Sequence, residues 1–233
     1  MNICVIPARG GSKRIPRKNI QKFLGKPIIA YSIEVALKSN CFDHVIVSTD
    51  DVEIAEVSKK YGAQVPFIRP AELSNDYIGT MPVIKHAIEW FDEQGRPPSN
   101  VCCLYATAPF VQEEIIKKAY EKMLKTNVDY CFTVTNFAFP IQRAIKLTKG
   151  NRIDMFHSEF FETRSQDLEE AYHDAGQFYW GRAEAFKQEK KMFLTDAVPY
   201  ILPRYLVQDI DTPEDWIRAE TMFRVLQKSK HNF

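Results

Sequence analysis

Short apolar runs alternate along this chain with longer stretches in which apolar residues recur every three or four positions. The short runs are typical of buried strands, and the periodic stretches are typical of amphipathic helices. The predicted strands cover residues 2–6, 44–48, 101–105, 130–135 and 177–180, with a short extended piece at 64–68. The predicted helices cover residues 27–38, 51–61, 80–93, 112–125 and 212–227.

This alternation predicts an α/β fold, with a Rossmann-like, mostly parallel sheet that carries helices on both faces. No internal repeat or low-complexity linker divides the chain, so we expect one domain over residues 1–233. In such sheets, ligands bind beyond the carboxyl ends of the strands. Three polar loops follow predicted strands, at residues 7–19, 48–51 and 106–110, and we expect them to converge on one cleft.

The alternation fails between residues 137 and 174, where aromatic and charged residues mix without a clear period. An interruption of this kind is typical of a flap, an oligomer arm or a substrate lid. We interpret it as an inserted segment, a small dimerisation arm or flap on the side of the substrate. Its aromatic residues favour packing in a dimer arm over stacking on a base; they are Phe156, Phe160, Phe161 and Tyr172.

The overall charge argues against general affinity for polyanions. Thirty-one Lys and Arg residues face thirty Asp and Glu residues, which leaves a formal net charge of +1 over 233 residues. A basic cluster in this chain is therefore a local feature, and we expect no nucleic-acid partner. A nucleic-acid-binding module remains a weaker alternative, which would require binding that falls steeply with salt.

The apolar runs are too short for a membrane span, and the first one is too short for the core of a signal peptide. The cysteines are five in number, and Cys4, Cys102, Cys103 and Cys131 lie in strand-like apolar runs. They are typical of small buried residues in a reducing compartment, and no pair has the spacing of a zinc site. We expect a cytoplasmic protein without a membrane partner.

The most basic stretch follows the first predicted strand. Its basic residues are Arg9, Lys13, Arg14, Arg17 and Lys18, and Gly10, Gly11 and Ser12 lie among them. The stretch matches neither the GxxxxGK[ST] nor the GxGxxG pattern. Glycines let backbone N–H groups approach an anion, and clustered positive charges are costly to fold without a polyanion to neutralise them. We interpret this basic loop as a triphosphate site; the alternative is a solvated basic turn.

An acidic pair lies near the end of the chain, at Asp209 and Asp211. Side chains two residues apart in an extended segment point the same way, so both carboxylates can face one hard cation. The following residues, Thr212 to Asp215, resemble the start of a helix, with Pro213 in its first turn. The alternative is therefore that Asp211 or Thr212 simply caps this helix, and both functions are compatible.

Together, a basic triphosphate loop and an acidic metal pair favour nucleotidyl transfer. In that reaction a sugar oxygen attacks the α-phosphate of a nucleotide and pyrophosphate leaves. A non-catalytic nucleotide-binding protein of the same fold is an alternative, against which the intact Lys18 and acidic pair argue. The sequence shows no Ser-His-Asp or Cys-His arrangement that would indicate a covalent enzyme nucleophile.

Four separated motifs resemble the CMP-sugar synthetases, cytidylyltransferases that activate 3-deoxy-2-ulosonic acids. They are PARGGSKRIPRKN from Pro7, VSTDD from Val47, RPAELSND from Arg69 and DIDTPEDW from Asp209. The resemblance covers essentially the whole chain. The third-strand loop reads YATAPF from Tyr105, where sialic acid synthetases usually have QPTSP, and Arg14 stands where glycine is common. With HDAGQFYWG from His173, these departures look most like pseudaminic acid cytidylyltransferases.

The resemblance implies which residues meet the nucleotide, and these are Ala8, Arg9, Gly10, Gly11, Ser12, Asn19, Arg69, Asp76 and Thr80. Arg9, Ser12 and Lys18 would hold the triphosphate of CTP, with Asn19 close to the α-phosphate and ribose. The cytosine and ribose pocket would be lined by Arg69 and by the segment with Asp76 and Thr80.

The resemblance also implies the metal and the assembly. Asp209 and Asp211 would bind Mg²⁺, Arg9 and Lys18 would act with them in catalysis, and the anomeric hydroxyl of the sugar would be the nucleophile. A homodimer is implied, with the segment from Phe137 to Tyr172 reaching across.

Contacts to the acidic sugar are the least determined. Arg143 and Arg164 are candidates for its carboxylate, and the other candidates are Tyr105, Thr107, His173, Asp174, Gln177 and Tyr179. Each of these residues could equally be structural. The alternatives for function are synthesis of CMP-N-acetylneuraminate or of another CMP-ulosonic acid, and sugar-1-phosphate nucleotidyl transfer.

Overall fold

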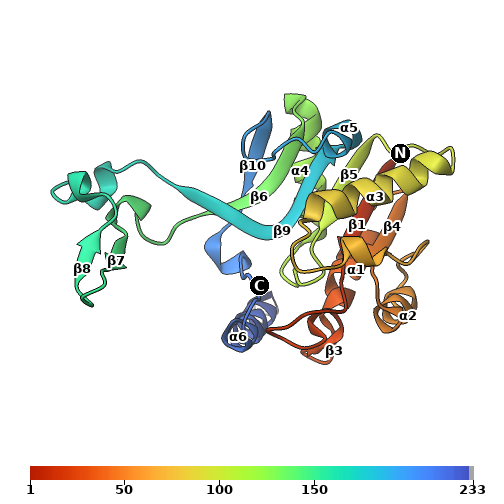
Figure 1. The fold of residues 1–233 in the computed structure, drawn as a ribbon, viewed down its shortest axis with the longest axis horizontal. Coiled ribbons are helices and arrows are strands. Elements are labelled where there is room, and N and C mark those ends of the chain that lie inside the picture. The colour runs from red at the N-terminus through yellow and green to blue at the C-terminus, as the bar shows by residue number, and fades with distance from the viewer. Residues whose placement is uncertain (231–233) are drawn as a thin grey trace.

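The computed structural model describes residues 1–230, and its centre is a six-stranded sheet (Figure 1). The strand order across the sheet is β10-β6-β9-β5-β1-β4. The bounds are β1 (Asn2–Pro7), β4 (His44–Ser48), β5 (Asn100–Leu104), β6 (Tyr130–Asn136), β9 (Tyr172–Arg182) and β10 (Ala197–Ile201). The predicted α/β class is confirmed, and the four strands predicted before residue 136 lie within about one residue of their expected bounds.

One central strand runs against the others. β1 pairs in parallel with both β4 and β5, and β10 pairs in parallel with β6, whereas β9 is antiparallel to its neighbours β5 and β6. The strand predicted at 177–180 is longer than expected, because β9 extends from Tyr172 to Arg182. Antiparallel pairing needs no helical crossover, so the chain can leave the sheet after β6 and return directly along it.

Helices cover both faces of the sheet, as predicted, with two apolar cores between the layers. The bounds are α1 (Ile28–Lys38), α2 (Val52–Lys60), α3 (Thr80–Glu93), α4 (Glu113–Thr126), α5 (Ala183–Lys187) and α6 (Pro213–Lys230). Helices α1, α2 and α4 bury apolar residues in one core, and α3 and α5 bury theirs in the other. Cys4, Cys102, Cys103 and Cys131 are buried free thiols in these strands, as their apolar neighbours suggested.

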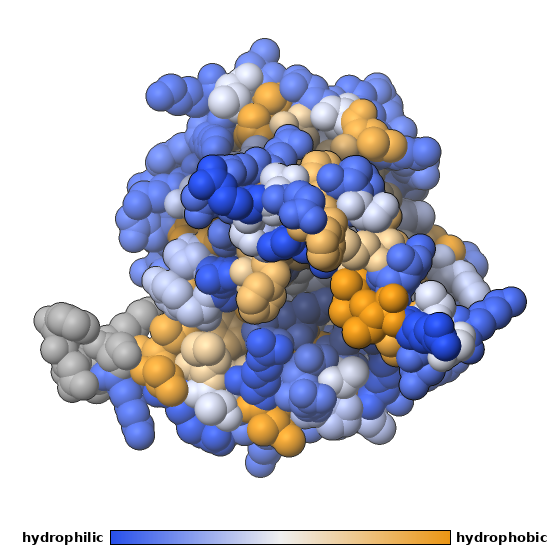
Figure 2. Space-filling view, turned by 90° about the vertical axis from the view of Figure 1, so that its left-hand side faces the viewer, coloured by the Kyte–Doolittle hydropathy of each residue, from blue (hydrophilic) through white to orange (hydrophobic). Residues whose placement is uncertain are grey.

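The segment between β6 and β9, residues 137–171, extends away from the sheet, and we call it the arm (Figure 1). It contains an antiparallel pair, β7 (Ile145–Leu147) and β8 (Ile153–Met155). Large apolar side chains stay exposed on it, among them Phe139, Leu147, Ile153, Phe156 and Phe161. Seen from the arm's end of the molecule, apolar side chains form several patches within a polar surface (Figure 2).

Some elements have weak sequence signals. The extended piece at 64–68 forms only one bridge, between Ile46 and Gln64, and β10 was not predicted. β10 reads AVPYI, and its Pro199 is tolerated because the strand lies at the edge of the sheet. A hairpin of two short strands, β2 (Lys22–Phe23) and β3 (Lys26–Pro27), precedes α1. No helix within the described range is both long and apolar enough to traverse a lipid bilayer.

Gly181 in β9 lies where the sheet packs tightly against buried aromatic rings. A Cβ at this position would lie 2.5 Å from the Tyr130 ring and 2.6 Å from the Phe186 ring, both of which are fully buried. We expect Gly181→Ala to lower the free energy of unfolding by about 1–3 kcal/mol through overpacking, measured by urea denaturation. Gly150→Ala is the matched control, because nothing lies within 4 Å of its Cβ position. Equal losses in the two variants would contradict the expectation.

Candidate active site

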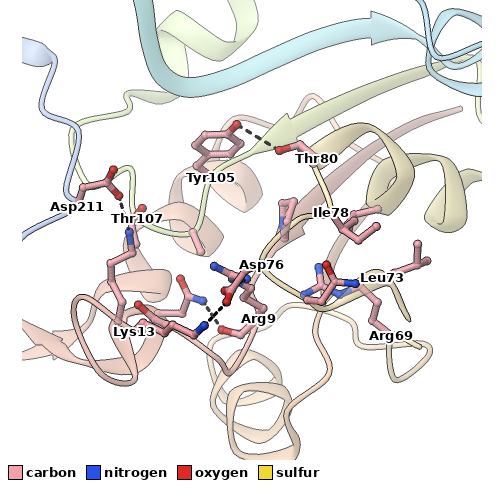
Figure 3. A pocket seen from close by; sticks show the side chains of 18 of the residues that line it. Arg9, Lys13, Arg69, Leu73, Asp76, Ile78, Thr80, Tyr105, Thr107 and Asp211 are labelled. Carbon is pink, nitrogen blue, oxygen red and sulfur yellow. Dashed lines mark hydrogen bonds and ion pairs between the residues drawn. The ribbon is translucent and has the colours of Figure 1, made fainter. Parts of the chain in front are cut away.

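A cavity of about 510 Å³ opens at the carboxyl ends of β1 and β5 (Figure 3). Three separate parts of the chain line it: the basic loop after β1, the segment from Arg69 into α3, and the loop after β5, with Asp211 added from the acidic pair. The lining residues are Pro7, Arg9, Ser12, Lys13, Arg14, Lys18, Asn19, Arg69, Leu73, Asn75, Asp76, Ile78, Gly79, Thr80, Val83, Tyr105, Ala106, Thr107 and Asp211. The loops after β1 and β5 converge on the cavity as predicted. The loop at 48–51 contacts the basic loop through Asp50 and Asp51 but does not line the cavity.

A small third core holds the two charged motifs side by side. Ile15, in the middle of the basic loop, and Ile210, between the two aspartates, are both buried in it. Trp216 of α6 and Phe110 from the loop after β5 belong to the same cluster. Each polar motif is thus held in place by one buried apolar residue. Burial of apolar surface stabilises the fold by about 25 cal/mol for each Å² removed from water. Residues almost 200 positions apart come together in this way.

The positive side chains of the cavity share two carboxylates. Arg9 lies 2.7 Å from Asp76, and Lys13 is paired with the same carboxylate. The hydrogen bonds from Lys13 and then Arg9 lower the pKa of Asp76. The other carboxylate, that of Asp211, is paired in the same way with Arg14 at 3.0 Å and Lys18 at 3.3 Å. Four cations therefore face two carboxylates, and the remaining positive charge favours an anionic ligand.

Arg17 and Lys18 are neighbours in sequence, but their side chains point in different directions and have different partners. Arg17 adopts the left-handed conformation, with φ of 57°, and its guanidinium pairs with Asp51 and Glu53, outside the cavity lining. The interpretation of Arg17 as part of the phosphate ring is therefore wrong. Lys18 instead donates to the Ile210 carbonyl at 2.7 Å and lines the cavity. The left-handed residue turns the loop so that the two side chains diverge.

Gly10, the first glycine of the pair, packs closely against the loop after β4. Gly10 donates its N–H to the Asp50 carboxylate at 2.9 Å, so this group is already satisfied within the protein. A Cβ on Gly10 would lie 2.7 Å from an Asp51 carboxylate oxygen, so the close approach of the loop to Asp51 requires glycine there. Ala8, Gly10 and Gly11 are absent from the cavity lining, and their contact with the nucleotide stays a prediction.

The start of α6 is capped without the carboxylates of the acidic pair, although the Asp211 backbone N–H donates to Asp215 at 3.2 Å. The Thr212 N–H donates to Asp215 at 2.8 Å, and the Asp215 N–H donates to the Thr212 hydroxyl at 3.2 Å, which is a reciprocal capping box. The predicted capping role therefore belongs to Thr212, with Asp215 as its partner. The Asp211 carboxylate is left to face the cavity and its cations.

The two carboxylates of the acidic pair, which were predicted to hold Mg²⁺, have different surroundings. Burial, and next the negative charge of Asp211, raise the pKa of Asp209, so the two carboxylates interact. Asp209 lies just outside the cavity lining, beside Gly176. In the described part of the chain, no group of three or more His, Cys, Asp or Glu residues could form a complete metal site. A pair of carboxylates beside an anion site suits Mg²⁺, which takes its other ligands from phosphate oxygens and water.

The residues predicted for the nucleoside, Asn19, Arg69, Asp76 and Thr80, all line this cavity. Arg69 is 4% exposed, donates from Nε to Ser74 at 3.0 Å, and has its pKa lowered by burial. Asn19 donates to the Arg9 carbonyl at 2.9 Å. Thr80 begins α3, and its hydroxyl lies 3.3 Å from that of Tyr105 (Figure 3). Lining residues that the sequence reasoning missed include Leu73, Ile78 and Val83, which have no chemical signal in the sequence.

Most of the predicted sugar contacts do not reach this cavity. Tyr105 and Thr107 line it, whereas Arg143, His173, Asp174, Gln177 and Tyr179 do not. Arg143 bonds to the Phe161 carbonyl within the arm, and Arg164 pairs there with Asp167. Gln177 is buried and donates to the Leu206 carbonyl, and His173 packs on Phe137. Within this single chain, these side chains are occupied by structural partners.

Comparison with known proteins adds independent information. Residues 3–207 match the family model described as cytidylyltransferase. Over 228 residues, the chain is 50% identical to pseudaminic acid cytidylyltransferase of Campylobacter jejuni, which covers 98% of each chain. It is 32% identical to CMP-N,N'-diacetyllegionaminic acid synthase of Legionella pneumophila, over 97% of this chain and 98% of that one.

A solved structure shares the fold. The CMP:2-keto-3-deoxy-manno-octonic acid synthetase, in complex with CTP, superposes with a TM-score of 0.69 and 17% identity. The match covers 96% of this chain and 98% of that one. At this identity the likeness concerns the fold alone.

Proposed function

The chain belongs to the cytidylyltransferase family, and on that premise we propose that it transfers CMP from CTP to pseudaminic acid with release of pyrophosphate. The observation that carries this proposal is the cavity in which four cations share two carboxylates at the carboxyl ends of parallel strands. The identity of 50% with a pseudaminic acid enzyme, against 32% with a legionaminic acid enzyme, supports the choice of sugar.

In this proposal the basic loop holds the triphosphate. Arg9, Ser12 and Lys18 bind its oxygens, and the phosphates take the place that Asp76 occupies beside Arg9 and Lys13. The base and ribose lie toward Arg69 and Thr80. This exchange of a carboxylate for phosphate preserves charge-assisted hydrogen bonds to the loop.

The reaction then needs no covalent enzyme intermediate. The anomeric hydroxyl of the sugar gives its proton to water or to a carboxylate of the acidic pair, and its oxygen forms a bond to the α-phosphorus. The bond from that phosphorus to the bridging oxygen breaks, and pyrophosphate leaves. Lys18 and Arg9 stabilise the charge that develops on the leaving group. Asp209 and Asp211 would hold Mg²⁺, which when bound offsets the charge of the phosphates.

A homodimer is part of the same proposal. The arm exposes Phe139, Leu147, Ile153, Phe156 and Phe161, and an apolar surface of this kind is typical of a contact with another subunit. A second copy that covers the arm would bury these side chains.

Pyrophosphate release measured with purified protein tests the function. We expect release with CTP, Mg²⁺ and pseudaminic acid, and much slower release with UTP or GTP in place of CTP. N-acetylneuraminic acid and N,N'-diacetyllegionaminic acid serve as competing acceptors in parallel reactions. Release with either of these but none with pseudaminic acid would contradict the sugar assignment. A requirement for a sugar 1-phosphate would contradict the reaction class.

A further inference from the structure

β9 contains an irregular step where it pairs with β6. Phe132 pairs with Tyr179, and two residues later Val134 pairs with Asp174. Five residues of β9 thus span the distance that two residues of β6 cover, and the extra residues form a bulge. Gly176 in the bulge has a φ of 61°, a left-handed conformation that favours glycine. Bulges of this kind redirect side chains and are common next to active sites.

The bulge brings an acid and a phenol together. The Tyr179 hydroxyl donates to one oxygen of the Asp174 carboxylate, and the other oxygen accepts the Gly176 N–H at 2.9 Å. Tyr179 is only 3% exposed and, like Asp174, is absent from the cavity lining. Neither residue is therefore placed to touch a ligand in the cavity, although both were predicted to contact the sugar.

Tyr179 is connected to the cavity through Tyr105. The two rings lie 5.3 Å apart between centroids, and burial, followed by the neighbouring Tyr105, raises the pKa of Tyr179. The Tyr105 hydroxyl lies 3.3 Å from that of Thr80, and both residues line the cavity. A row of side chains therefore runs from Asp174 through Tyr179 and Tyr105 to Thr80, in which Tyr179 and Tyr105 are joined by their ring contact.

The hydrogen-bonding chemistry of these side chains determines which of them donates and which accepts. A carboxylate only accepts hydrogen bonds, so Tyr179 uses its one proton on Asp174 and offers only lone pairs to other groups. Tyr105 is the neighbouring hydroxyl that can donate to them. When Tyr105 donates to Tyr179, its oxygen is left as an acceptor, both for the Thr80 hydroxyl at 3.3 Å and for a hydroxyl or amide N–H of a bound molecule.

We propose that Asp174 and Tyr179 are positioning residues that orient the Tyr105 hydroxyl, and that Tyr105 accepts a hydrogen bond from a hydroxyl or amide N–H of the sugar acceptor. This inference rests on the proposed function, because it assumes that the acceptor binds in this cavity. The other side of the bulge supports the placement, since the Cβ position of Gly176 lies 3.9 Å from the carboxyl carbon of Asp209. Gly176 of the bulge thus lies close to Asp209 of the acidic pair.

Single and double variants test the inference with the acceptor that the wild-type protein uses. We expect Tyr179→Phe and Tyr105→Phe each to raise the KM for the acceptor by about 5- to 10-fold, the loss of one hydrogen bond, with the KM for CTP unchanged. Asp174→Asn should have an effect of the same kind. In the double variant Tyr105→Phe/Tyr179→Phe, the two effects should not multiply, because both changes remove one shared arrangement.

A matched control uses another tyrosine. Tyr120 bonds through its hydroxyl to Asn2 and Asn100, at the amino ends of β1 and β5, opposite the ends that line the cavity, and Tyr120→Phe should leave both KM values unchanged. Multiplying effects in the double variant, or equal changes in the two KM values of Tyr179→Phe, would overturn the inference. A Tyr179→Phe enzyme with wild-type KM values would also overturn the inference, but it would leave the proposed function intact. Failure of the wild-type protein to release pyrophosphate with any ulosonic acid would instead overturn the proposed function, and this inference with it.

Discussion

Asp211→Ala is expected to slow pyrophosphate release by on the order of 10²- to 10³-fold, while the free energy of unfolding stays within about 1 kcal/mol of the wild-type value. Activity falls because the variant loses one of the two carboxylates proposed to hold Mg²⁺. Stability is largely kept because the pairs of Asp211 with Arg14 and Lys18 are partly exposed, with 38% of the Asp211 side chain accessible. The measurements are turnover at saturating CTP over a range of Mg²⁺ concentrations, and urea denaturation.

Asp215→Ala is the matched control, with the same chemical change four residues later. It removes the capping box at the start of α6, so we expect a loss of about 1 kcal/mol in stability. Turnover should stay near the wild-type value, because Asp215 is absent from the cavity lining. The two variants therefore have opposite expected profiles. An Asp211→Ala enzyme with wild-type turnover would remove Asp211 from the proposed site.

The fold was predictable where burial dominates the sequence pattern. β1, β4 and β5 are nearly continuous apolar runs between helices, and their parallel pairing follows from that order. β10 was missed because it is a partly exposed edge strand with Pro199 at its centre. The true extent of β9 was also missed, because the signal of alternation is lost where the bulge interrupts it. Only the partner strand shows that Tyr172 already belongs to the sheet.

The family was predictable from its motifs, and the match over residues 3–207 confirms it. Arg69, Asp76, Thr80 and Asp211 were placed in the site from the resemblance, and all line the cavity. The packing of Gly10 was not predicted, because the sequence does not show that Asp50 and Asp51 lie against it. Such contacts depend on how a loop folds back on its neighbour, which no local pattern records.

The sugar-side residues were the hardest to predict, for a physical reason. Asp174 and Tyr179 are polar residues on a strand next to the site, which is the usual signature of ligand contact. Their placement instead depends on the bulge and on the left-handed Gly176, which turn Asp174 toward Tyr179. A one-residue change of register would move either side chain to the other face of the sheet.

Lys18→Met is expected to reduce turnover by on the order of 10²- to 10³-fold, because it removes the positive charge proposed to stabilise the leaving pyrophosphate and keeps a side chain of similar length. Lys18 is suited to this role by its fixed position, since its ammonium donates to the Ile210 carbonyl at 2.7 Å and only 20% of its side chain is exposed. The KM for CTP should rise as well. Pyrophosphate release at several CTP concentrations separates the two effects.

Arg17→Met makes the same change of charge one residue earlier and decides between two explanations. If turnover depends on the total charge of the basic loop, the two variants should be equally slow. If it depends on where each charge points, Arg17→Met should lose about 1 kcal/mol of stability, since its partners are Asp51 and Glu53, and should keep most of its turnover. We expect the second result, because the left-handed backbone at Arg17 directs that side chain away from the cavity that Lys18 lines. Equal slowing would instead mean that the loop acts through its summed field alone.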